Sequence, residues 1–197
     1  KAQAAGAAAV AITMDQQASY YERAAHLRHL TEDPRTAGTP PRRPTTKNPY
    51  RVPEGRLWYN WKYIDEIRPF IKVPVVAKGI LTAEDAELCI EHGMNGIYIS
   101  NHGGRSLDYG PSTLEVLPEI VSAVRGRVPI MIDSGFRSGT DILKALALGA
   151  NVVTVGRAAR WGLGAFGDAG VQKVFEILQG ELVMAMAQTG RPTLASI

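Results

Sequence analysis

The chain has 197 residues, of which 45% are hydrophobic and 21% are charged, and its formal net charge is +3. This composition is typical of a globular domain with a sizeable core and excludes an intrinsically disordered chain. The positive charge is small and scattered, which argues against nucleic-acid binding, and no apolar run approaches the roughly 20 residues that cross a bilayer. The single cysteine, Cys89, lies in an apolar stretch and has the pattern of a buried side chain.

The amino-terminal segment predicts one strand, from Ala7 to Asp15, after an alanine-rich opening. The chain starts without methionine, and Lys1–Val10 lacks the layout of a signal peptide. We therefore expect a cytoplasmic location, or a peroxisomal one in a eukaryote. The opening resembles the end of a helix, as if upstream sequence had been removed.

A proline-rich segment follows, and it predicts a long loop over about 31–57. Repeated prolines block regular structure there, and few apolar residues are available to bury. Arg42, Arg43 and Lys47 could form a polybasic contact site, but a solvated excursion is the simpler interpretation. Loops of this length in compact domains are commonly lids or disordered segments.

From Val73 onward, short apolar runs alternate with helical patterns, which is typical of βα units that build a parallel sheet. Each run is apolar throughout, as a strand covered on both faces must be. The predicted strands are Val73–Gly79, Asn95–Gly104, Val128–Gly135 and Asn151–Arg157.

The helices between these strands carry their own start and stop signals. Thr82 with Asp85, and Ser112 with Glu115, match the spacing of a capping box. The glycines at predicted helix ends are Gly93, Gly126 and Gly149. Apolar residues at a helical period predict the last helix from about Val171 to Gln188.

Each of the four strands changes character at its carboxyl end. The apolar runs give way to Lys78, to Asn101 and His102, to Asp133, and to Gly156 and Arg157. In a parallel barrel the carboxyl ends of the strands converge on one mouth, so residues far apart in the sequence line a single pocket. The sequence therefore predicts one shared site rather than four unrelated loop charges.

Glycines gather at the same strand ends, where they let the backbone approach a ligand and offer N–H groups to a phosphate. They are Gly103, Gly104, Gly135, Gly139 and Gly156. Arg137 and Arg157 add positive charge beside the last two strands, where barrels frequently hold phosphate. A phosphorylated cofactor is the prediction, although phosphate-binding barrels also serve isomerases, aldolases and synthases.

The segment SNHGGRSLDYGP, from Ser100 to Pro111, resembles the active-site signature of the FMN-dependent α-hydroxy acid oxidase and dehydrogenase family. Glycolate oxidase, lactate oxidase, flavocytochrome b2 and mandelate dehydrogenase are members. Further support comes, in the family's order, from Pro74–Ala86, Ile132–Ala150 and Val155–Arg157. The resemblance is good from about Leu57 to the end and weaker over Ala5–Asp15. It implies an α/β fold, the carboxyl-terminal portion (about strands 4 to 8) of a TIM (β/α)8 barrel whose first strands are absent from this chain.

The resemblance also implies FMN as the cofactor. Lys78 would lie by N1 and O2 of the flavin and stabilise negative charge on the reduced ring. Thr13 and Ser100 would hydrogen-bond the isoalloxazine or ribityl portion, and Asp133 would bind ribityl hydroxyls. The residues expected around the phosphate are Gly135, Arg137, Gly156 and Arg157, and Ser134 belongs to the same cofactor-binding set.

For catalysis, the resemblance implies His102 as the base, Asp15 as the group that stabilises the imidazolium, and Arg105 as the partner of the substrate carboxylate. A neutral imidazole, with a pKa near about 6.5, is well suited to accept a proton near neutrality, and a planar guanidinium binds a carboxylate through two hydrogen bonds. The implied reaction oxidises an (S)-2-hydroxy acid to a keto acid, through hydride transfer or through a carbanion. Oxygen, a quinone or a cytochrome would all be compatible electron acceptors.

Two features depart from the family pattern. The family commonly reads TVDTP after its fourth strand, then a glycine and a substrate-binding arginine, but here Glu22 falls at the arginine position and Arg23 is one place later. Arg23 is therefore the candidate for a second carboxylate-binding residue. Because five predicted strands cannot close an eight-stranded barrel, we expect an upstream fragment of the same barrel, or another copy of the chain, to lie beside it. Tetramers are expected by analogy with the family.

Two other interpretations stay open. A non-redox phosphate-binding barrel, such as an isomerase or lyase, could use Lys78 as acid, base or Schiff-base amine. A half-barrel could also bind flavin or assemble without turnover. No metal-ligand spacing links the histidines, so no metal site is predicted, and surface or capping roles are expected for His26, His29 and His92.

Overall fold

The computed structural model describes residues 1–15, 60–105, 107 and 109–197. Within them, five parallel strands form one sheet in which the strands lie side by side in chain order. The strands are β1 (Val10–Thr13), β2 (Val75–Ile80), β3 (Gly96–Ile99), β4 (Ile130–Ile132) and β5 (Val152–Val153). Four of them fall inside a predicted strand, and β2 extends one residue beyond its predicted end at Gly79. Parallel neighbours in sequential order are the arrangement found in the wall of an α/β barrel.

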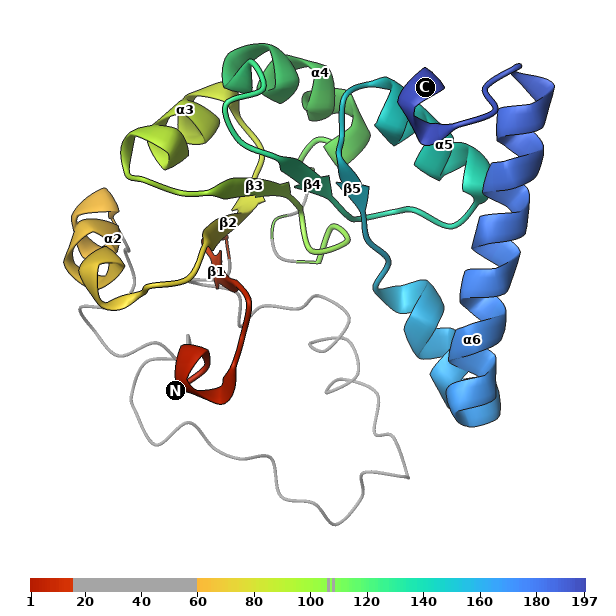
Figure 1. Ribbon diagram of the computed structural model, residues 1–197, viewed down its shortest axis with the longest axis horizontal. Coiled ribbons are helices and arrows are strands. Elements are labelled where there is room, and N and C mark those ends of the chain that lie inside the picture. Colours follow the sequence, from red (N-terminus) through yellow and green to blue (C-terminus); the bar gives the residue numbers. More distant parts are fainter. Residues whose placement is uncertain (16–59, 106, 108) are drawn as a thin grey trace.

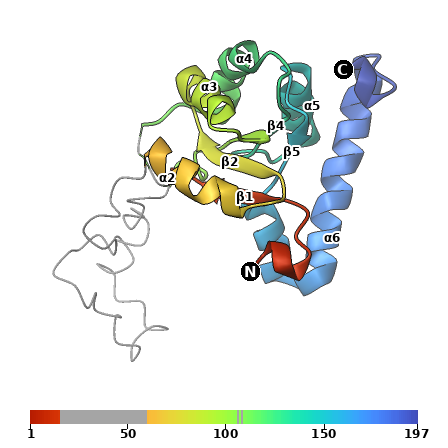
Figure 2. The same ribbon diagram turned by 60° about the vertical axis from the view of Figure 1, so that its left-hand side comes forward.

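Helices connect the strands and cover one side of the sheet (Figure 1). They are α2 (Trp61–Ile67), α3 (Ala83–Glu91), α4 (Thr113–Val124), α5 (Gly139–Ala147) and α6 (Arg157–Gln188). Helices α3, α4 and α5 lie together on one side of the strands, α2 lies near the β1 end, and α6 runs along α5 at the β5 end (Figure 2). None of the described helices combines the length and apolar character that a membrane span requires.

Side-chain caps fix the starts of helices α3, α4 and α5. The hydroxyl of Thr82 accepts a hydrogen bond from the Asp85 N–H at 3.2 Å, and Ser112 with Glu115 forms a complete capping box. The spacing predicted a capping box at both starts, and at Thr82 the hydroxyl bond is the part of the box that forms. Ser138 and Asp141 form a further box at the start of α5. Because the cap satisfies N–H groups that have no partner inside the helix, each helix begins at a defined residue after its strand.

The predicted glycines end the helices. Gly93, Gly126 and Gly149 follow α3, α4 and α5 and have φ angles of 74°, 71° and 104°. A side chain would be strained in this left-handed conformation, so glycine is the residue that ends a helix this way most easily.

Two boundaries differ most from the predictions. Strand β3 ends at Ile99 instead of continuing to Gly104, because His102, Gly103 and Gly104 turn the chain with positive φ angles of 52°, 73° and 72°. Helix α6 begins at Arg157, well before Val171, and is interrupted at Phe166 and Gly167. Its first half is rich in glycine, so the apolar period that reveals a helix in sequence is weak there.

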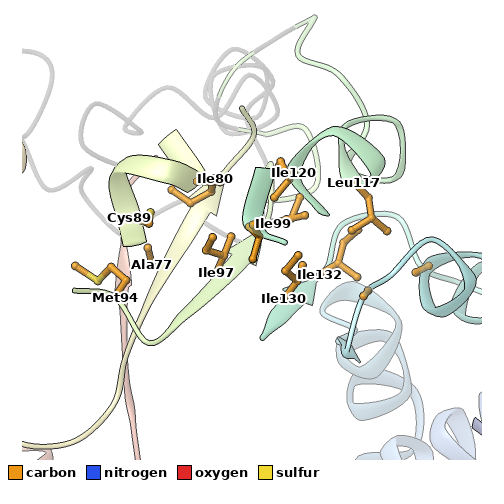
Figure 3. Packing of buried hydrophobic residues seen from close by; sticks show 14 of the residues in the cluster. Ala77, Ile80, Cys89, Met94, Ile97, Ile99, Leu117, Ile120, Ile130 and Ile132 are labelled. Atoms are coloured by element: carbon orange, nitrogen blue, oxygen red, sulfur yellow. The ribbon is translucent and has the colours of Figure 1, made fainter. Parts of the chain in front are cut away.

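The core lies between the sheet and helices α3 and α4 (Figure 3). Ala77, Ile97, Ile99 and Ile132 are fully buried and meet Leu117, Ile120 and Cys89 from the helices. Burial raises the pKa of the Cys89 thiol to about 12, with a further contribution from Asp85, so this cysteine is an inert core residue, as predicted. The neighbours of the core residues along the strands point to the opposite face of the sheet, and this parity places Lys78, Tyr98 and Met131 side by side there.

Candidate active site

Lys78, Ser100 and Asp133 meet at the carboxyl ends of β2, β3 and β4. The Lys78 ammonium donates hydrogen bonds to Ser100 Oγ at 2.6 Å and to Asp133 Oδ2 at 3.0 Å. The three residues come from separate βα units, so only the parallel sheet can bring them together. The expected convergence of these strand ends is present in the structure.

The carboxylate of Asp133 is held in its ionised form. Burial alone would raise its pKa, but hydrogen bonds from Ser100, Ser134 and Lys78, together with the positive charge of Lys78, hold the pKa of Asp133 below its usual range. The side chains of Lys78 and Asp133 are only 17% and 19% exposed. At neutral pH the pair is therefore a partly buried ion pair that water screens weakly.

Tyr98 lies beside Lys78 on the same face of the sheet. The Lys78 ammonium is 4.4 Å from the centre of the Tyr98 ring, within range of a cation–π interaction, and the phenol hydroxyl hydrogen-bonds Thr154 Oγ1. Burial raises the pKa of Tyr98, against the effect of the Thr154 hydrogen bond and with a smaller contribution from Asp133, so the phenol stays neutral. Sequence reasoning missed Tyr98 and Thr154, because both sit within apolar runs that indicate strands and nothing more.

His102 and Asp15 form a second hydrogen-bonded pair next to this cluster. His102 Nδ1 is 2.5 Å from Asp15 Oδ2, although the residues are 87 positions apart, and their side chains are 13% and 18% exposed. Asp15 Oδ2 can accept a hydrogen bond from Nδ1, and in that tautomer Nε2 is the ring nitrogen that can take up a proton. Asp15 Oδ1 is buried and has no hydrogen-bond partner among the described residues.

Gly79 allows Asp15 to take this position. A Cβ atom at Gly79, which has a φ of 102°, would lie 2.3 Å from Asp15 Oδ1. No side chain fits in that space, so the close approach of the carboxylate to the end of β2 requires glycine.

Two serine hydroxyls hold the backbone of the loop that carries His102. Ser100 Oγ accepts a hydrogen bond from the His102 N–H at 3.2 Å. Ser134 Oγ accepts from the Asn101 N–H at 3.3 Å and from the Gly103 N–H at 3.1 Å. The loop is therefore fixed by side chains from β3 and β4 rather than by a regular hydrogen-bond ladder.

The glycines and arginines expected at a phosphate lie at the ends of β4 and β5. A Cβ atom at Gly135 or Gly156 would meet nothing within 4 Å, so the backbone there is open. Arg157 donates a hydrogen bond to the Gly103 carbonyl at 2.9 Å, which ties the start of α6 to the His102 loop. The Arg137 guanidinium lies 5.1 Å from the ring centre of Trp161.

Of the other candidate residues, Thr13 and Arg105 lie within the described part of the chain. Thr13 is the register partner of Lys78 across β1 and β2. Arg105 is exposed and follows His102 by three positions on the same loop. Arg23, His26, His29 and the proline-rich loop predicted over 31–57 lie outside the described residues.

His92 lies apart from this site, on the outer side of the sheet. It is the C-cap residue of α3, in line with the predicted capping role. Its Nδ1 is 2.6 Å from Asp65 Oδ1, and its ring stacks on Trp61 with a centroid distance of 5.0 Å. Over the parts of the chain that the structure describes, no three histidine, cysteine or acidic side chains gather as a metal site.

The family model described as FMN-dependent dehydrogenase matches residues 1–197. The chain therefore belongs to this family, whose cofactor is FMN. The resemblance seen in the sequence is confirmed over the whole chain.

Curated relatives are hydroxyacid oxidases. A peroxisomal (S)-2-hydroxyacid oxidase of Arabidopsis thaliana is 50% identical over 139 residues, which are 71% of this chain and 38% of the relative. The 2-hydroxyacid oxidase 1 of Homo sapiens is 53% identical over 131 residues, which are 66% of this chain and 35% of the relative. The match thus spans well under half of each relative's length.

Solved structures of the family share the fold. A lactate oxidase of Pediococcus acidilactici has a TM-score of 0.81 at 34% identity, covering 99% of this chain and 53% of that one. A mandelate oxidase with a monooxide FMN adduct has a TM-score of 0.76 at 36% identity, covering 99% of this chain and 54% of that one. The parallel sheet described here is therefore part of an FMN-dependent TIM barrel, as the sequence implied.

The residues at the strand ends fit FMN. The open backbone at Gly135 and Gly156, with Arg137 and Arg157 close by in the chain, supplies the N–H and guanidinium donors that a phosphate dianion needs. Lys78 supplies a positive charge at the same edge of the sheet, which suits a ring that gains negative charge on reduction. The unpartnered Asp15 Oδ1 leaves an acceptor beside His102 for one further donor.

Proposed function

We propose that this chain forms the carboxyl-terminal part of the active site of an FMN-dependent (S)-2-hydroxyacid oxidase or dehydrogenase, which converts a 2-hydroxy acid to a 2-keto acid. The observation that carries the proposal is the partly buried pair of His102 Nδ1 and Asp15 Oδ2, 2.5 Å apart and adjoining the Lys78–Asp133 ion pair. Membership of the FMN-dependent dehydrogenase family supplies the chemistry that this geometry serves.

His102 is the proton acceptor of the reaction. Its Nε2 takes the proton that the substrate loses, from the hydroxyl in a hydride route or from the α-carbon in a carbanion route. The ring then carries a positive charge, and Asp15 stabilises that charge at hydrogen-bond distance. The partial burial of both side chains strengthens this interaction because water screens it less.

The cofactor would be held along the carboxyl ends of the five strands. Lys78, Thr13, Ser100 and Asp133 would hold the ring and ribityl chain, and Gly135, Arg137, Gly156 and Arg157 would hold the phosphate. FMN, when bound, accepts the two electrons that the substrate gives up. The Lys78 ammonium is already paired with Asp133, so its orientation is set before FMN binds.

Arg105 binds the substrate carboxylate. Its position three residues after His102 puts the charge that orients the substrate on the same loop as the base. Arg23 is the candidate for a second contact to the carboxylate. The substrate class is therefore small 2-hydroxy acids such as glycolate, lactate and mandelate, with the side chain left unspecified by these residues.

Further strands complete the barrel. Within the described residues, β1 and β5 each pair on one side only, and Val152 of β5 is 42% exposed. An edge strand with unpaired N–H and C=O groups favours pairing with another strand. We expect an amino-terminal segment of the same barrel, or another copy of the chain, to cover these edges, and a homo-oligomer such as a tetramer to form.

The ion pair of Lys78 argues against a non-redox lyase. A Schiff-base or general-base lysine needs a nitrogen that is open to the substrate, whereas the Lys78 nitrogen is held by hydrogen bonds to Ser100 Oγ and Asp133 Oδ2. This leaves flavin chemistry as the function that best uses the arrangement.

Anaerobic reduction tests the proposal. Purified protein reconstituted with FMN should show flavin absorbance, and adding glycolate, lactate or mandelate without oxygen should bleach it. Protein that binds no FMN would overturn the proposal. Normal FMN content without bleaching by any hydroxy acid would instead indicate a flavin-binding half-barrel without turnover.

A further inference from the structure

Ser134 has a backbone conformation that a serine rarely adopts. Its φ angle is 79°, in the left-handed region where a side chain is strained and glycine is not. Strain of this kind persists only where the surroundings hold it, and it gathers at functional sites. The buried Thr113 hydroxyl holds the turn from one side, by donating to the carbonyls of Asp133 at 2.6 Å and Ser134 at 3.2 Å.

The hydroxyl of Ser134 uses all its hydrogen-bonding capacity within the protein. It donates to Asp133 Oδ1 at 2.7 Å and accepts from the N–H groups of Asn101 and Gly103. A hydroxyl offers one donor and two acceptor sites, and all three are occupied. In this arrangement the Ser134 side chain has no bond left for a cofactor.

Ser100 repeats the same connection from the neighbouring strand. Its hydroxyl accepts from the His102 N–H and hydrogen-bonds the Asp133 carboxylate. Three successive amides, from Asn101 to Gly103, are thus held by two serine hydroxyls that share one carboxylate partner. Because an ionised acceptor polarises the hydroxyls, each serine oxygen becomes a better acceptor for the loop amides.

We propose that Ser134 is a positioning residue, whose hydroxyl couples the Asp133 carboxylate to the backbone of the His102 loop and so holds the imidazole against Asp15. His102 itself has a φ of 52°, so its loop needs outside support to keep this shape. The inference rests on the proposed role of His102 as base. The hydrogen bonds of the hydroxyl explain why serine occupies a position where glycine would be less strained.

Two substitutions separate the hydroxyl from the backbone strain. Ser134→Gly removes the hydroxyl and relieves the strain, while Ser134→Ala removes the hydroxyl and keeps it. Thr82→Ala is the matched control, because it removes a hydroxyl that caps α3 and touches no part of the site. A purely structural role for Ser134 predicts that the glycine variant is as active as the parent.

Positioning predicts a different outcome. In the FMN-loaded protein, Ser134→Gly should keep the parent melting temperature and FMN affinity but lose about tenfold to a hundredfold in kcat, with KM little changed. Ser134→Ala should lose the same activity and also some stability, and Thr82→Ala should lose stability alone. Parental kcat in Ser134→Gly would overturn the inference, and so would a loss that saturating FMN restores, since that identifies a flavin ligand.

Hydrogen exchange supplies a readout that does not depend on turnover. The Asn101 and Gly103 amides should exchange about five- to tenfold faster in Ser134→Gly than in the parent, while the Ile97 amide, which bonds the Pro129 carbonyl in the sheet, is unchanged. Faster exchange in a protein that oxidises no hydroxy acid would support the positioning role while rejecting the proposed function. Equal exchange in parent and variant would reject the positioning role whatever the activity.

Discussion

Two histidine–aspartate pairs in this chain have nearly the same hydrogen bond and different surroundings. His102 Nδ1 and Asp15 Oδ2 are 2.5 Å apart at the strand ends, and His92 Nδ1 and Asp65 Oδ1 are 2.6 Å apart on the outer helices. The inner pair adjoins a lysine and open glycine backbone, whereas the outer pair stacks on Trp61 and its aspartate is 55% exposed. The bond alone therefore does not identify a base; the role proposed for His102 depends on its place at the carboxyl end of a parallel sheet.

The largest expected effect comes from replacing the two histidines in turn. His102→Gln should lower kcat by about 10²- to 10⁴-fold, because the base that takes the substrate proton is lost. His92→Gln should leave kcat unchanged. Steady-state kinetics on both FMN-loaded variants makes the comparison, and equal effects would remove the distinction between the pairs.

Substitution of the two aspartates, Asp15 and Asp65, tests the same comparison between the two pairs. Asp15→Asn keeps the shape of the side chain but removes the charge that stabilises the imidazolium, so kcat should fall by about 10²-fold or more. Asp65→Asn should retain activity. The measurement is the pH profile of kcat. If the maximal kcat of Asp15→Asn equals that of the parent, Asp15 plays no part in the proton transfer.

Substitution of Arg105 tests how the site that contains His102 and Asp15 binds its substrate. Arg105→Lys keeps the charge but loses the planar pair of donors, so KM for a hydroxy acid should rise by about tenfold to a hundredfold with a smaller effect on kcat. Arg127 hydrogen-bonds helix carbonyls far from the site, and Arg127→Lys is the control. An unchanged KM in Arg105→Lys would place the carboxylate elsewhere.

Low pH should lower the stability of the folded protein, because it protonates Asp133. Its pKa is lowered in the folded protein, so the ionised form adds stability that is fully present above the unfolded value of about 3.9 and is lost as the pH falls through the folded value. Denaturant unfolding of the parent and of Asp133→Asn should differ by about 1–3 kcal/mol near neutral pH. This difference in unfolding free energy should shrink as the pH falls below about 4. A difference that does not change with pH would exclude this linkage.

The smallest effect is expected at the outer pair. Trp61→Leu removes the ring that stacks on His92 and should cost about 0.5–1.5 kcal/mol of unfolding free energy, with kcat unchanged. Thermal melting measures the first and steady-state kinetics the second. A loss of activity at constant stability would link α2 to the reaction.

Much of the fold could be predicted because its signals are local. Apolar runs located all five strands, and the spacing of Ser112 with Glu115 located a helix start. The strand-end rule also anticipated the meeting of Lys78 with Asp133. The roles proposed for Asp15 and Arg105, by contrast, come only from the resemblance to the family.

The missed features depend on register and on loop geometry. Tyr98 shares a face with Lys78 only because their strands align residue by residue, with an irregularity just beyond Lys78 that no sequence pattern reveals. Ser134 was expected to touch the cofactor, yet its hydroxyl bonds amides more than 30 positions away. Its left-handed backbone runs against the preference of serine, so local rules could not place it.

Gly79 carries a consequence for reading natural variation. The missing side chain there leaves just enough room for the oxygen of Asp15, which in turn faces His102. A glycine-to-alanine change is usually scored as mild, but one added methyl group here would displace the aspartate that hydrogen-bonds His102, the proposed base. Inherited or engineered alleles at this codon should therefore behave as loss-of-function alleles, although the altered residue touches no substrate.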